Sequence, residues 1–169
     1  MRYPALAPIA ALLLLSTVAL IGCSRGGAEA ASSQTPSTRV HPVSGLPIVA
    51  LAVESQGKVH KFAVEVASTE AEQAKGLMFR TAMGADEGMI FPRKEARMAA
   101  FWMRNTVIPL DIIFIGPDRR ILNIGAEAQP YDETPVPSSG PVIAVLELNG
   151  GRAAQLGLAP GDKVSWKAP

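Results

Sequence analysis

The 169-residue chain has few of the residues that usually mark metal or redox sites. Cys23 is its only cysteine, so no disulfide can form within the chain and the folded part must be stable from packing alone. It has two histidines, His41 and His60, which argues against a His-ligated metal centre. The sequence also lacks a phosphate-binding loop, a dinucleotide-binding glycine motif and a nucleophile elbow. It therefore predicts no metal and no cofactor.

An excess of either charge is also missing. The chain has 16 basic and 15 acidic residues, and removing residues 1–22 would delete only Arg2 and take the net charge from +1 to zero. Nucleic-acid binding depends on neutralising phosphates with lysine and arginine. We therefore expect no nucleic-acid partner.

Residues 9–22 form the one uncharged apolar run near the start of the chain. The run is shorter than the roughly 20 residues that span a bilayer, and with Arg2 before it, it predicts a secretory signal peptide over residues 1–22. Residues 20–23, LIGC, resemble the lipobox of bacterial lipoproteins, in which the cysteine is lipidated. The alternative is ordinary cleavage after the AEA sequence of residues 28–30.

Lipidation of Cys23 would make the membrane a partner of the protein, because two acyl chains give stable anchoring. The expected location is the periplasmic side of the cell envelope. In Gram-negative lipoproteins, an aspartate directly after the lipidated cysteine often resembles a signal for retention in the inner membrane. This chain has Ser24 at that position, which slightly favours the outer membrane. Residues 23–45 are rich in Ser, Gly, Ala and Pro and predict a flexible tether. Residues 46–169 are expected to form a single globular domain.

Short strands and helices, bounded by recognisable turn and cap residues, are predicted after the tether. Residues 47–54 and 58–67 predict two strands joined by a hairpin turn. Thr69 and Glu72 predict a capping box that begins a short helix, and Gly76 ends that helix. A second short helix is expected over residues 150–157, with Asn149 as its cap.

The remaining segments read mainly as strands. Strands are predicted over residues 88–91 (ended by Pro92), 98–106, 110–115, 120–128, 141–149 and the last residues of the domain. Residues 128–141 form a long Pro- and Ser-rich loop, which is a candidate functional loop. The expected fold is α+β and β-rich: a compact antiparallel or mixed sheet, with a barrel-like form as one option, and two short helices.

Five segments together resemble a known family. They are GLMFR (76–80), GMIF (88–91), FWMRNTVIPLDIIFI (101–115), VLELNGG (145–151) and LGLAPGD (156–162). This series is similar to that of the bacterial and archaeal domain-of-unknown-function family 192. The resemblance implies a compact, β-rich and often exported domain, and it implies no reaction. In the family the position of Arg104 is often a lysine, so this chain keeps the charge there and changes the donor geometry.

Asp111 is the unusual residue of the longest segment, because it interrupts an otherwise apolar strand. A buried carboxylate is costly unless it is paired, and Arg80 and Arg104 are its expected partners. Glu147 poses the same question, since leucines flank it on both sides. Structural ion pairs and a shared polar pocket both remain open for these acids.

Three further residues of the segment are candidates for ligand binding. Trp102 could stack on a sugar or peptide ring or belong to the core. Asn105 and Thr106 could contact a ligand or cap a turn.

Three functions are compatible with these residues. The sequence favours a non-catalytic, lipid-anchored envelope module that binds a small molecule, glycan or protein in a polar pocket near Arg80, Arg104 and Asp111. The alternatives are a hydrolase that uses Asp111 and Glu147 as an acid–base pair, and a scaffold without a pocket. Paired carboxylates that cut glycosidic bonds face one cleft about 5–10 Å apart, so the direction of these two side chains distinguishes the alternatives.

Overall fold

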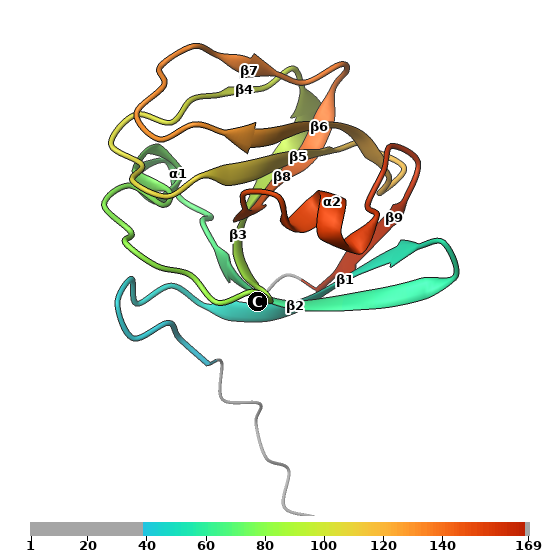
Figure 1. Cartoon of the computed structure of the whole chain (residues 1–169), viewed down its shortest axis with the longest axis horizontal. Coiled ribbons are helices and arrows are strands. Elements are labelled where there is room, and N and C mark those ends of the chain that lie inside the picture. The colour runs from blue at the N-terminus through green and yellow to red at the C-terminus, as the bar shows by residue number, and fades with distance from the viewer. Residues whose placement is uncertain (1–38, 168–169) are drawn as a thin grey trace, which may run out of the picture. The chain divides into compact units, whose positions relative to one another are not determined.

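The structure, a computed structural model, describes residues 39–167. This part of the chain contains nine strands and two helices (Figure 1). In chain order they are β1 (Ile48–Ser55), β2 (Lys58–Val66), α1 (Glu70–Lys75), β3 (Glu87–Arg97), β4 (Ala100–Phe101), β5 (Leu110–Ile115), β6 (Ile121–Ala128), β7 (Val136–Pro137), β8 (Val142–Asn149), α2 (Arg152–Leu156) and β9 (Lys163–Trp166).

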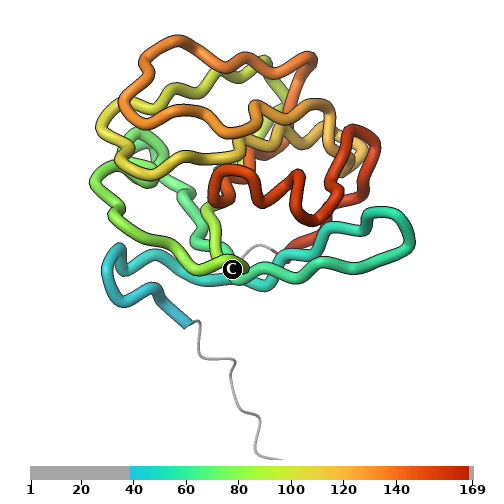
Figure 2. Tube along the Cα trace, in the orientation of Figure 1, coloured from blue at the N-terminus to red at the C-terminus, as the bar shows by residue number. Residues whose placement is uncertain are grey.

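Seven strands form one mixed sheet in the order β6-β5-β8-β3-β2-β1-β9. Only β2 and β3 pair in parallel, and α1 lies in the connection between them. The sheet curls, as the Cα trace shows (Figure 2), and its two edges meet at a single bridge between Arg120 and Lys163. The predicted β-rich α+β fold with two short helices is confirmed, and the curled sheet is not a closed barrel.

The sheet has an apolar core on each face. The inner face, enclosed by the curled sheet, carries residues of all seven strands together with Ala153 of α2. The outer face packs under β4 and β7, which pair with each other and lie together at one end of the domain (Figure 1). Strand β5 contributes to both cores, and all six of its residues are buried. Its side chains alternate, so Ile112 and Phe114 face outward while Ile113 and Ile115 face inward.

The predicted hairpin and the predicted ends of the first helix are confirmed. Gln56 and Gly57 connect β1 to β2 with φ angles of 48° and 75°, as a two-residue hairpin turn requires. The capping box of α1 is complete, because the Thr69 side chain accepts the Glu72 N–H and the Glu72 side chain accepts the Thr69 N–H. Gly76 ends the helix.

Two strand predictions were wrong. Strand β3 continues through Pro92 to Arg97, because beyond Ile90 it pairs only with β8 and has a free side for a residue without an N–H. Residues 98–106 do not form one strand. Only Ala100–Phe101 are extended, in β4, and Met103 to Thr106 form a turn closed by the Thr106 N–H and the Met103 carbonyl.

Residues 39–45 belong to the folded domain, although they were predicted to be part of the tether. Val40 forms a bridge with Pro47, and the Ile48 N–H donates to the Arg39 carbonyl. The predicted signal peptide, Cys23, the alternative cleavage site and most of the tether lie outside the described residues. Within residues 39–167, no helix is long and apolar enough to cross a membrane.

Candidate functional site

Asp111 is fully buried on the inner face of the sheet, and backbone N–H groups satisfy its carboxylate. One oxygen accepts hydrogen bonds from Glu127 at 2.8 Å and Gly151 at 3.0 Å, and the other accepts from Ala153 at 2.7 Å. Gly151 and Ala153 begin α2, whose own N-cap residue has no side chain to cap it. Asp111 therefore caps a helix from a neighbouring strand, which is a structural role.

The arginines expected beside Asp111 lie elsewhere. Arg80 pairs with Glu65, and Arg104 lies 3.9 Å from Glu133. The predicted pocket that joins Arg80, Arg104 and Asp111 is not formed. Asn149 was also misassigned as the cap of α2, because its side-chain amide donates to the carbonyls of residues 83 and 84.

Glu147 faces the opposite side of the sheet from Asp111. In the register of β5 with β8, Glu147 pairs with Ile112 and Asp111 pairs with Leu148, and cross-strand partners share a face. Ile112 belongs to the outer core and Leu148 to the inner core. The predicted acid–base pair of Asp111 and Glu147 was wrong, because the sheet separates the two carboxyls.

Glu147 is largely buried, and its carboxyl has no protein partner among the described residues. The residue is 5% exposed, and none of the hydrogen bonds or ion pairs among residues 39–167 includes its side chain. Burial raises the pKa of Glu147 to about 8. The group is therefore mostly protonated at neutral pH, and it can both donate and accept a hydrogen bond.

Glu147 lines a cavity of about 330 Å³ on the outer face, a volume at the small end of the range for ligand sites. Four of the five motif segments contribute to the walls, together with the end of α1 and two arginines of β3. The lining residues are Gln73, Ala74, Lys75, Gly76, Leu77, Met78, Phe91, Arg93, Arg97, Ala100, Phe101, Trp102, Arg104, Thr106 and Glu147. We call this cavity the Glu147 pocket.

Three of the predicted binding residues line the Glu147 pocket. Trp102 is 47% exposed, and the Arg104 guanidinium lies 5.7 Å from the centre of its ring. Thr106 is buried, and its hydroxyl donates to the Arg104 carbonyl at 3.3 Å. Asn105 does not line the cavity. It adopts a left-handed conformation (φ 54°), and its carbonyl accepts the N–H of Phe79, which is also left-handed (φ 62°).

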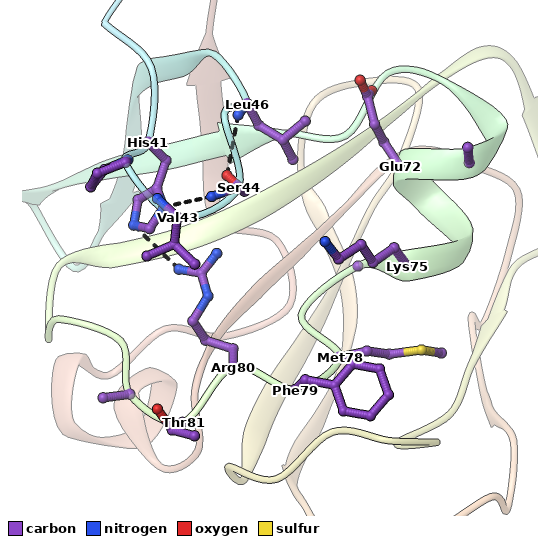
Figure 3. A pocket seen from close by; sticks show the side chains of 14 residues that line it. His41, Val43, Ser44, Leu46, Glu72, Lys75, Met78, Phe79, Arg80 and Thr81 are labelled. Atoms are coloured by element: carbon purple, nitrogen blue, oxygen red, sulfur yellow. Dashed lines mark hydrogen bonds between the residues drawn. The ribbon is translucent and has the colours of Figure 1, made fainter.

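Arg80 lies in a second, larger pocket of about 720 Å³ between the first described residues and α1. Its guanidinium donates to Glu65 at 2.8 and 3.0 Å and lies 3.3 Å from the His41 ring. The Ser44 hydroxyl also hydrogen-bonds Glu65. In Figure 3, Arg80 points toward His41, and Lys75 and Phe79 lie on the other side of the pocket. The buried pair of Arg80 and Glu65 fixes residues 41–44 to the sheet.

The two pockets share Lys75, Gly76 and Met78 as a common wall. The wall begins where α1 ends, so the GLMFR segment separates one pocket from the other. Gly76 turns the chain there with φ of 47°, and a Cβ atom at Gly76 would lie 3.4 Å from the Phe91 ring.

Sequence reasoning missed several residues of these sites. Glu65 is 3% exposed, and it was not among the predicted site residues. Arg93 and Arg97, which line the Glu147 pocket, were not among the predicted site residues. Nothing in the local sequence indicates that His41 reaches Glu65. Among residues 39–167, no group of three or more His, Cys, Asp or Glu side chains could hold a metal ion.

Two crystal structures are similar to the chain. One is of a protein of unknown function from Novosphingobium aromaticivorans DSM 12444, with 63% sequence identity and a TM-score of 0.75, and it covers 78% of this chain and 94% of that chain. The other is from Sinorhizobium meliloti 1021 and is described as a "putative transcription regulator". It has 37% identity and a TM-score of 0.70, and covers 72% of this chain and 95% of that chain. No curated protein matches the chain.

The profile of DUF192, described as an uncharacterized ACR, matches residues 51–166. The matched range contains all five motif segments, and four of them meet at the Glu147 pocket. The predicted resemblance is therefore confirmed, and the chain belongs to the DUF192 family.

Proposed function

We propose that this protein is a non-catalytic binding module whose Glu147 pocket takes a small ring ligand with hydroxyl groups, such as one saccharide unit of a glycan. One observation carries the proposal: a largely buried carboxyl that has no protein partner among residues 39–167 lines a cavity built from four of the motif segments. Burying such a group costs stability, and a ligand that hydrogen-bonds to it would recover part of that cost.

The walls of the Glu147 pocket suit a sugar ring. A protonated Glu147 can donate to one hydroxyl oxygen and accept from another hydroxyl. The half-exposed Trp102 offers an apolar ring face, and Phe101 packs edge-on against Phe91 at 5.0 Å between ring centres, which stiffens the wall. The lining thus combines aromatic and apolar side chains with polar and charged ones, as recognition of a hydroxyl-bearing ring requires.

The lining of the pocket favours binding over hydrolysis. Glycoside hydrolysis by paired carboxylates requires two acids that face each other across the substrate. Glu147 is the only acid among the described residues that line this cavity, and Asp111 lies beyond the sheet with its oxygens occupied. The lining therefore contains one carboxyl and no second carboxylate to activate water.

The test is ligand-observed NMR on the full chain with glucose, N-acetylglucosamine and glucuronate as probes. We expect saturation transfer to at least one probe, with the signal lost in Glu147→Leu and in Trp102→Ala. Tyr131→Ala is the matched control, because Tyr131 is 63% exposed and does not line the pocket. If none of the three probes binds, or if Glu147→Leu binds as well as wild type, the proposal is wrong.

The proposal includes the cellular setting expected from the sequence: export, and attachment to the membrane through a lipidated Cys23 on the periplasmic side of the envelope. The apolar run of residues 9–22 followed by LIGC supports it. Labelled palmitate should enter the wild-type chain in cells and not the Cys23→Ser variant. Equal labelling of both proteins would contradict lipidation of Cys23.

A further inference from the structure

We infer that the ligand of the Glu147 pocket carries an anionic group, and that Arg93 and Arg97 of β3 hold this group at the edge of the cavity. The inference rests on the proposed function and narrows its ligand to an acidic saccharide, with a carboxylate or a phosphate on the ring. Glu147 and Trp102 would contact the ring, and the two arginines would contact the anion.

The charges of the lining residues are the first argument. The described lining contains four cations (Lys75, Arg93, Arg97 and Arg104), and its one acid, Glu147, is mostly neutral at neutral pH. Among residues 39–167, only Arg104 of these four cations has an ion-pair partner, at 3.9 Å, and both side chains of that pair are more than half exposed. Such a pair holds its members weakly. The lining of this pocket thus carries more positive than negative charge, and Lys75, Arg93 and Arg97 form no ion pair among the described residues.

Arg93 gives the second argument, because it is held in an unfavourable position. Its Nε–H is buried and has no hydrogen-bond partner among the described residues. Burial, and then the positive charge of Arg97, lower the pKa of Arg93. A carboxylate or phosphate between the two guanidinium groups would satisfy the donor and offset the repulsion, and guanidinium groups match both anions in a two-bond fork.

The backbone of β3 brings the two arginines toward one place. Between Pro92 and Arg97 the strand advances five residues, while its partner β8 advances only two, from Ala144 to Val142. Five residues of regular strand would extend about 17 Å, so the extra residues must bulge out of the ladder. The bulge shortens the distance along the strand and sets both arginines at the same cavity. The residues between Pro92 and Arg97 have no pairing partner in β8, so the bulge adds nothing to the pairing of these two strands.

The experiment is calorimetric titration of the full chain, at neutral pH and low salt, with four probes: glucose, glucuronate, glucose 6-phosphate and inorganic phosphate. We expect glucuronate or glucose 6-phosphate to bind at least about tenfold more tightly than glucose, because a carboxylate or phosphate accepts stronger, charge-assisted hydrogen bonds from guanidinium groups than a neutral hydroxyl does. The preferred acid identifies the anion as a carboxylate or a phosphate. Inorganic phosphate should bind more weakly than the preferred acidic sugar.

Variants of the two arginines test whether they cause the preference for an acidic sugar. Arg97→Gln, at an exposed position, and Arg93→Gln should each remove most of the preference for the acidic sugar over glucose. Lys94→Gln is the matched control, since this neighbouring cation does not line the Glu147 pocket and should keep the preference. Because Arg97 is exposed, a folding defect in the Arg93 variant would not prevent the test.

Four outcomes would overturn the inference. Equal affinity for glucose and both acidic sugars, or an unchanged preference in both arginine variants, refutes the anion site while the binding function stands. Inorganic phosphate that binds as tightly as glucose 6-phosphate refutes the role of the ring. If no probe binds, the proposed function fails, and this inference fails with it.

Discussion

Asp111 on β5 and Glu147 on β8 are both buried, but they differ in their hydrogen-bond partners and in the face of the sheet on which they lie. Asp111 faces the inner core and receives three backbone N–H groups. Glu147 faces the outer side, one register position away, and receives none. The two acids look alike in the sequence, since each stands between large apolar residues. The hydrogen bonds of Asp111 stabilise the fold, whereas the carboxyl of Glu147 has no hydrogen-bond partner among the described residues.

Glu65 completes the comparison as a third buried acid. It is balanced by the charge of Arg80, whereas Asp111 is balanced by backbone dipoles and Glu147 by taking up a proton. The first two solutions stabilise the native state. The third does not, because a carboxyl that must stay protonated costs stability as the pH rises. This difference is why we propose Glu147 as the centre of the binding site.

The largest expected effect is the pH dependence that Glu147 causes. Its pKa is near 4.5 when unfolded and about 8 when folded, so between these values the native state binds the extra proton. The free energy of unfolding should therefore fall as the pH rises from about 5 to about 8, by up to about 5 kcal/mol. Urea unfolding across this range measures it.

Glu147→Gln is the control for this prediction, because its side chain is neutral at every pH. Subtracting the variant's profile removes the contribution of all other titrating groups. The difference should be small at about pH 5 and grow toward about pH 8 in favour of the variant. Parallel profiles for the two proteins would mean that Glu147 is not the unbalanced acid.

The next effect tests the acid that is balanced by charge. Arg80→Ala leaves Glu65 buried without its cation, and this should lower the free energy of unfolding by about 3–5 kcal/mol. Lys163→Ala is the matched control, because the pair of Lys163 and Glu54 at 3.6 Å is about half exposed and should contribute less than about 1 kcal/mol. Equal losses in the two variants would contradict a buried pair.

The smallest of the three effects tests the acid that is balanced by backbone groups. Asp111→Asn replaces an acceptor oxygen with an NH₂ group that faces N–H donors, so the free energy of unfolding should fall by about 3 kcal/mol. Asp132→Asn is the control, since Asp132 accepts one N–H in an exposed loop and its loss should be much smaller. If Asp111→Asn kept full stability and lost ligand binding, the roles of Asp111 and Glu147 would be reversed.

Local patterns predicted the elements whose contacts lie close in sequence. The hairpin of β1 and β2 and the capping box of α1 depend on neighbours a few residues apart, and strand β5 was predicted from its continuous apolar run. Pro92 was misread because its effect depends on which side of β3 carries a partner strand. Likewise, the cap of α2 comes from Asp111, 40 residues before Gly151, and no short-range signal indicates it.

The candidate site was predictable only in part. Trp102, Arg104 and Thr106 were recognised as unusual polar or aromatic residues in an apolar segment, and they line the pocket. The pairing of Asp111 with Glu147 failed because strand alternation fixes which residues share a face only once the register is known. Arg93 and Arg97 were missed because a bulge, invisible in the sequence, brings them to the cavity.

The contacts of His41 and Ser44 with the Arg80 and Glu65 pair determine how far this domain can be shortened at its start. A chain that starts at Leu46, where composition alone would place the boundary, loses both the His41 ring and the Ser44 hydroxyl beside the Arg80 and Glu65 pair. Water would then reach a charge pair that the intact chain keeps almost dry, and the 720 Å³ pocket would lose one wall. Any shortened form used to study this family member should therefore begin no later than Arg39, whose carbonyl still pairs with β1.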